Sequence, residues 1–96
     1  MSQIGLLVWH MGIQNKASDW RQVVQRLIKA EMSKRGLKYQ TLSDELAKIG
    51  VQQSADNLRN KINRGILGAD LLLQLILIMN IRKIGIDEVH DILDTL

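Results

Sequence analysis

The chain has no cysteine, no proline and no phenylalanine, and aromatic residues make up only 3% of it. The absence of cysteine excludes a disulfide framework and thiolate chemistry, and it agrees with a cytoplasmic location. Without proline and with so few aromatic residues, the core must be built from leucine, isoleucine, valine and methionine, which favours packed helices over a sheet. The composition therefore predicts an all-α protein.

The length of the chain predicts the number of domains, and the distribution of charge indicates the kind of partner. A chain of 96 residues forms one domain, and 46% hydrophobic residues are enough for a packed core. The net charge is +3, but residues 19–64 hold ten Lys/Arg against five Asp/Glu, whereas residues 65–96 hold two against five. This asymmetry is expected when the first two thirds of a chain face a polyanion, although an ordinary solvated surface has the same composition.

Residues 1–18 are predicted to form an N-terminal arm before a domain over residues 19–96. The apolar run at residues 4–11 is too short for a membrane span, which needs about 20 residues. It has no basic start and no small-residue cleavage site, so it does not resemble a secretory signal. We expect a short strand, or an arm packed on the body or on a partner subunit, and no membrane partner.

Three helices are predicted over the basic part of the chain. The first runs from about Ser18 or Asp19 to Arg35, with Ser18 as its cap and Gly36 as its end. Its apolar stripe is Trp20, Val23, Val24, Leu27, Ile28 and Met32. The second covers about residues 39–48, with Leu42, Leu46 and Ile49 inward and with Ser43 and Ala47 as small contact residues.

The third helix follows Ser54 as N-cap and ends at Gly65. Leu58 and Ile62 point inward, so the opposite face is predicted to carry Asp56, Asn57, Asn60, Asn63 and Arg64, flanked by Arg59 and Lys61. Asparagine is a mediocre helix former, so the presence of three asparagines on one helix face favours a functional role for that face. Amides pair with adenine and arginine with guanine, while other cations hold phosphates. A polar face without selected function is the alternative.

Two further helices complete a compact bundle of about five short helices. The fourth, about residues 69–79, is apolar at eight of nine positions from Leu71 to Met79, which predicts burial on more than one side. Either a partner subunit covers the surplus, or the last helix and the arm cover it within one chain. The last helix is predicted to start at a capping Asp87 and to pack through Val89, Ile92, Leu93 and Leu96.

No catalytic, metal or cofactor site is predicted. The two histidines, His10 and His90, stand alone in the sequence, and no pattern of metal ligands surrounds them. The segment from Gly65 to Gly68 lacks the ending of a phosphate-binding loop. We therefore do not expect an enzyme.

The segment GLKYQTLS at residues 36–43 resembles the start of Cro/λ-repressor-type helix-turn-helix domains, and KINRG at residues 61–65 resembles their end. The resemblance covers residues 19 to about 80. It implies a bacterial or phage DNA-binding protein, often a dimer, whose second helix of the motif lies in the major groove. The distance from Ser43 to Leu58 is about five residues longer than in the tight motif, which predicts a longer helix or a looser turn. A small uncharacterised bacterial family has this same long-turn pattern.

The resemblance also implies roles for individual residues. Phosphate contacts fall to Lys38, Tyr39 and Arg64, and base-edge contacts to Gln53, Ser54, Asn57 and Asn60. Arg59 and Lys61 fit either role.

Two functions remain as hypotheses. The first is sequence-specific binding of double-stranded DNA by a small transcriptional regulator or antitoxin-like repressor. Such a protein would be a homodimer through residues 71–79, the C-terminal helix or the N-terminal arm. The second is a protein-interaction or assembly module that keeps the helix-turn-helix scaffold without binding DNA.

Overall fold

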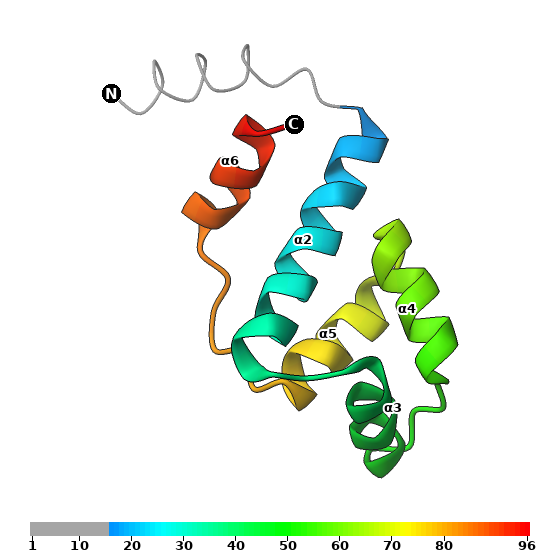
Figure 1. Cartoon of the computed structure of the whole chain (residues 1–96). Coiled ribbons are helices and arrows are strands. Elements are labelled where there is room, and N and C mark those ends of the chain that lie inside the picture. Colours follow the sequence, from blue (N-terminus) through cyan, green and yellow to red (C-terminus); the bar gives the residue numbers. More distant parts are fainter. Residues whose placement is uncertain (1–15) are drawn as a thin grey trace.

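A computed structural model describes residues 16–96, which form five α-helices and contain no strand (Figure 1). The predicted all-α fold is thus confirmed for this part of the chain. Residues 1–15 of the predicted arm lie outside the described residues. The helices are α2 (Ala17–Arg35), α3 (Tyr39–Lys48), α4 (Ala55–Arg64), α5 (Ala69–Ile78) and α6 (Ile86–Asp94).

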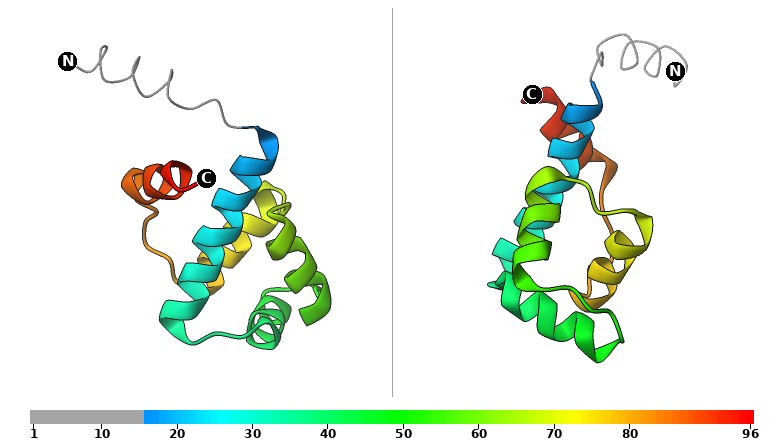
Figure 2. Two further views of the ribbon diagram at one scale, coloured as in Figure 1. Left: turned by 45° about the horizontal axis from the view of Figure 1, so that its top comes forward. Right: turned by 90° about the vertical axis from the view of Figure 1, so that its right-hand side faces the viewer.

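Helix α2 is the longest element, and it lies between α6 on one side and α4 on the other (Figure 2). Helices α4 and α6 both pack on α2, while α3 packs on α4 and α5. The largest fully buried side chains come from four of the five helices: Ile28, Leu42, Leu46, Leu58, Ile62 and Leu75. Each such side chain contributes about 1.5–3 kcal/mol when it is fully buried. The core therefore fixes α3 and α4 against α2 and α5.

The start of α2 differs from the prediction. The helix begins at Ala17, so Ser18 lies inside it and is not its cap. The carboxylate of Asp19 instead accepts a hydrogen bond from the backbone N–H of Lys16, at 3.1 Å. Asp19 is at the third helical position, from which an acidic side chain can reach back to the N–H of the N-cap residue. Ser18 is at the second helical position, so it is not the cap. Trp20, predicted inward, is 41% exposed in this first turn.

The end of α2 agrees with the prediction. Gly36 has φ 63°, and the N–H of Leu37 donates to the carbonyl of Met32 at 2.9 Å. This left-handed cap turns the chain, and the half-buried Leu37 packs against the core. The turn therefore fixes where α3 begins.

Helices α3 and α4 have the predicted bounds. The predicted N-cap Ser54 accepts a hydrogen bond from the backbone N–H of Asn57 at 3.1 Å. Ala47 and Ile49 do not pack inward as expected: both are exposed. Ala47 lies about 120° around the helix from the buried stripe, and Ile49 follows the last helical residue.

Among residues 16–96, helix α5 is covered on one side only. Leu71 and Leu75 are buried, whereas Leu73 and Leu77 are 64% and 67% exposed. Burial on several sides was predicted, but α6 packs on α2 and leaves this face open among residues 16–96. Among residues 16–96 the surplus apolar surface inferred from the sequence is therefore exposed on α5, and cover by residues 1–15 stays a prediction.

Helix α6 begins at Ile86, with Gly85 in the N-cap position, so Asp87 is not the cap. Asp87 lies in the first turn, where a carboxylate still complements the positive end of the helix dipole. Leu93 is buried, but Leu96 is 39% exposed because the helix has already ended. An Arg26 guanidinium also donates to the Thr95 hydroxyl at 2.8 Å. Across residues 16–96, no helix has the length and apolarity that a membrane crossing requires.

Candidate nucleic-acid interface

The outer face of α4 is a polar surface held in place by its inner face. Leu58 and Ile62 are 0% exposed, and they fix the rotation of the helix about its axis. The exposed residues of the helix are those predicted from the spacing: Asp56, Asn57, Arg59, Asn60, Asn63 and Arg64. The three asparagines are thus accessible, and α4 offers amides and cations to a partner in solution.

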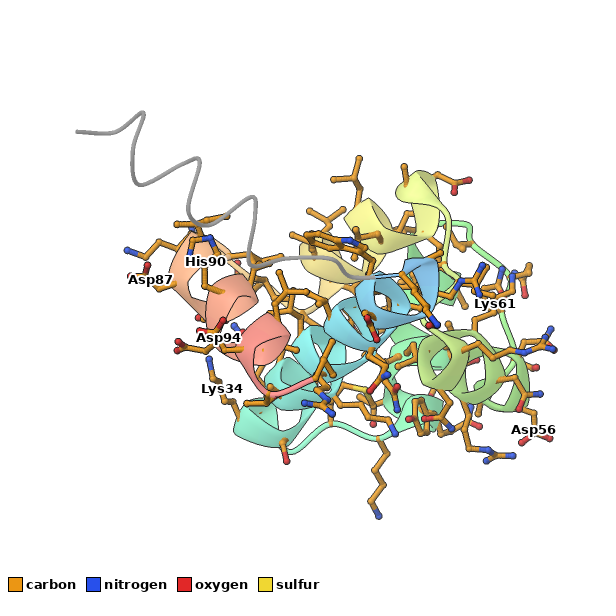
Figure 3. All side chains as sticks on the ribbon, turned by 90° about the horizontal axis from the view of Figure 1, so that it is seen from above. Lys34, Asp56, Lys61, Asp87, His90 and Asp94 are labelled. Atoms are coloured by element: carbon orange, nitrogen blue, oxygen red, sulfur yellow. The ribbon has the colours of Figure 1, made fainter. Side chains whose placement is uncertain are left out.

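Acidic side chains do not block this face. The one carboxylate within α4, that of Asp56, forms an ion pair with Arg59 one turn later. Figure 3 shows Asp56 and Lys61 at the edge of the molecule formed by α4. The acidic residues Asp87 and Asp94 lie on the opposite side, on α6 (Figure 3). Asp87 and Asp94 therefore lie away from the asparagine face.

The flank of α4 is tied to the segment before it. Gln53 is half-buried, and its backbone carbonyl accepts a hydrogen bond from the hydroxyl of Ser43 at 2.6 Å. Its side-chain oxygen accepts from the ammonium of Lys61 at 3.4 Å. Gln53 and Lys61 thus share a contact that the sequence did not predict. Each must be partly released before it can contact another molecule.

Two of the predicted phosphate contacts lie at the start of α3. Lys38 is exposed in the N-cap position of the helix. Tyr39 is half-buried and packs against the core. The structure therefore places Lys38 in solvent and gives Tyr39 a packing role as well.

Ion pairs divide the basic residues into two groups. Lys34 and Arg35 both pair with the buried Glu31, and Lys48 pairs with Glu45 at 2.7 Å. The hydrogen bond from Lys48 to Glu45 raises the pKa of the lysine. Arg21, Lys38 and Arg64 are among the cations whose side chains form no ion pair or hydrogen bond within residues 16–96. This second group is free to hold an external anion.

A polar pocket of about 380 Å³ lies between α2 and the end of α4. Its lining residues are Ser18, Arg21, Gln22, Gln25, Asn63, Arg64 and Ile66. Of these, only Arg64 was among the predicted site residues. Arg21, Gln22 and Gln25 were missed because no local pattern shows that this side of α2 meets α4.

Gly65 explains how the pocket forms. Its backbone φ is 66°, a value that residues with a side chain rarely adopt. Its Cα faces the backbone of Arg21. A Cβ added at Gly65 would overlap the Arg21 carbonyl oxygen and lie 2.6 Å from the carbonyl carbon. Glycine thus lets the two backbones touch, and this contact brings Arg64 beside Arg21.

The described residues contain no candidate metal site. Across residues 16–96, no three His, Cys, Asp or Glu side chains come together in a way that could hold a metal ion. His90 lies on α6 near Asp87 (Figure 3), away from the asparagine face.

Comparison with known proteins assigns the chain to a family. No curated protein and no solved structure matches it. The model of the family described as "Domain of unknown function (DUF6471)" matches residues 20–84. The match includes α3, α4, α5 and most of α2, and it ends before α6. Since it spans more than half of the chain, the protein belongs to this family of domains of unknown function.

Proposed function

We propose that this protein binds double-stranded DNA through a helix-turn-helix formed by α3 and α4, and that it acts as a small transcriptional regulator or antitoxin-like repressor. The observation that carries the proposal is the exposed row of amides and cations on α4, above an inner face that is fully buried. Such a helix can present side chains to base edges while its orientation stays fixed.

The link between α3 and α4 supports a fixed geometry. It spans residues 49–54, so it is longer than the turn of about 3–4 residues that is usual for the motif. The hydrogen bond from Ser43 to the carbonyl of Gln53 ties the end of this link back to α3. The long turn therefore leaves α4 held against α3, as docking in a groove requires.

Base-edge contacts are assigned to Ser54, Asn57 and Asn60, with Gln53 once Lys61 releases it. Ser54 accepts from the Asn57 backbone, and its O–H group stays available as a donor. Lys38 and Arg64 are assigned to phosphates because neither side chain has a hydrogen-bond or ion-pair partner among residues 16–96. Arg59 reaches DNA after it leaves Asp56, so its role depends on the competition between that carboxylate and a phosphate.

The test measures binding to a random pool of duplexes at low and moderate salt. Affinity should fall steeply with salt, because each neutralised phosphate contributes about 0.9 to the slope of log K against log salt. Affinity that does not change with salt, or no binding at low salt, would reject the proposal.

Selectivity tests the asparagine face itself. The wild type should bind the duplexes that it selects from the pool more tightly than random duplexes. This ratio of affinities should fall about tenfold or more in Asn57→Ala and in Asn60→Ala, as expected for lost base contacts. Alanine is the better helix former, so these variants should stay folded. Lys83→Ala, exposed in the connector before α6, is the control. Unchanged selectivity in both asparagine variants would contradict the assigned face.

The open face of α5 favours a second candidate, a protein-interaction or assembly module. Leu73 and Leu77 are exposed one turn apart, and large apolar surfaces of this kind mark contacts with other proteins. The candidate predicts no response to DNA and a melting temperature that rises with protein concentration. Leu73→Gln with Leu77→Gln should abolish that concentration dependence.

A further inference from the structure

The pocket between α2 and α4 has the charge of an anion site. Two arginines line it, Arg21 and Arg64, and no acidic residue among residues 16–96 does. The nearest acidic residue in the sequence, Asp19, lies about 160° around α2 from Arg21, and it accepts the backbone N–H of Lys16. Neither arginine has an internal hydrogen-bond or ion-pair partner among residues 16–96.

The other polar groups of the pocket can donate hydrogen bonds. The side-chain oxygen of Gln22 accepts from Arg26 at 3.4 Å, which leaves its amide NH₂ group as a donor. Gln25 and Asn63 add two more amides, and Ser18 adds a hydroxyl from the first turn of α2. That turn also carries the positive end of the helix dipole. The lining therefore suits a group with several acceptor oxygens and negative charge.

The pocket is assembled before any ligand arrives. The backbone contact between Gly65 and Arg21 fixes the end of α4 on α2, so both arginines start from rigid positions. A planar guanidinium matches a phosphate by two parallel hydrogen bonds, and a prearranged pair loses little freedom on binding. A free nucleotide fits less well, because among residues 16–96 Ile66 is the only apolar side chain in the lining and no aromatic ring is there to stack on a base.

We infer that this pocket binds a phosphate of the DNA backbone, next to the groove that α4 enters. The inference rests on the proposed function and adds Arg21 to its contacts. Asn63 and Arg64 belong both to the pocket and to the outer face of α4, so a strand lying along that face reaches the pocket directly. Arg21 and Arg64 then hold the same phosphate from two helices.

The experiment compares duplex binding by the full chain and by Arg21→Gln, Arg64→Gln and the double variant. Arg82→Gln is the control, since it removes the same charge from an exposed connector residue outside the pocket. Each pocket variant should weaken binding about five- to tenfold and lower the salt slope by about one, equally for all sequences. The double variant should lose less than the product of the two, because both arginines hold one phosphate.

The outcomes distinguish a failure of this inference from a failure of the proposed DNA binding. If the wild type binds duplexes but Arg21→Gln behaves like Arg82→Gln, the pocket is not a contact and only this inference fails. If the two losses multiply, the arginines act on separate phosphates, and the shared site is again rejected. If the wild type binds no duplex at low salt, both the inference and the proposed function fail. All four arginine variants change exposed side chains, and a circular dichroism melt checks that each remains folded.

Discussion

Replacing Gly65 by alanine should break the contact that holds α4 on α2. The glycine has φ 66°, and a side chain in this left-handed region costs about 1–2 kcal/mol. The added Cβ would also lie 2.6 Å from the carbonyl carbon and 2.8 Å from the Cα of Arg21. Backbone atoms cannot rotate away as a side chain does, so the two helices must separate. Forcing extra atoms into a packed contact costs about 1–3 kcal/mol more.

Gly36 provides a matched control for this substitution. It also ends a helix, its φ is 63°, and a Cβ added there meets nothing within 4 Å. Gly36→Ala should therefore show the conformational cost alone, about 1–2 kcal/mol, whereas Gly65→Ala should lose about 2–5 kcal/mol in total.

Urea denaturation followed by circular dichroism measures both free energies of unfolding. The difference between the two variants isolates the cost of the α2–α4 approach. Equal losses would refute the reasoning, because they would mean that the added methyl group meets no backbone at Gly65. A loss of duplex binding in Gly65→Ala alone would also connect this contact to the proposed interface.

Three other predictions concern stability. Ser54→Ala should cost about 1 kcal/mol, measured by urea denaturation, because the N–H of Asn57 loses its cap; an unchanged midpoint would contradict that cap. Leu58→Ala should cost about 2–5 kcal/mol and Leu73→Ala less than about 0.5 kcal/mol, since the first side chain is buried and the second is 64% exposed; similar losses would contradict this assignment. Burial raises the pKa of Glu31, but the hydrogen bonds and charges of Arg35 and Lys34 outweigh it, so the pKa is lower than the usual 4.5. The stability that Glu31 contributes is therefore complete above pH 4.5 and disappears as the pH falls through the lower folded-state pKa. Glu31→Gln should lose about 1 kcal/mol at neutral pH and show a weaker acid dependence than the wild type, and parallel pH profiles would speak against this contribution.

The candidate site was predicted in part from the sequence. The exposed asparagines of α4 followed from the spacing of Leu58 and Ile62, since helical periodicity alone decides which residues share a face. The contact of Lys61 with Gln53 could not be predicted, because it depends on how the link folds back beside α4. The same holds for the pairing of Arg59 with Asp56, which is one of several rotamer choices open to an exposed arginine.

The sequence by itself determined the helices and where most of them end. Gly36, Ser54 and Gly65 act on backbone groups only a few residues away, so their effects can be read before the fold is known. The tertiary structure decided which surfaces meet. It placed Arg21 beside Arg64, set α6 on α2, and left Leu73 and Leu77 uncovered among residues 16–96. These contacts join segments far apart in the chain, and they arise from how whole helix surfaces pack, which no local spacing specifies.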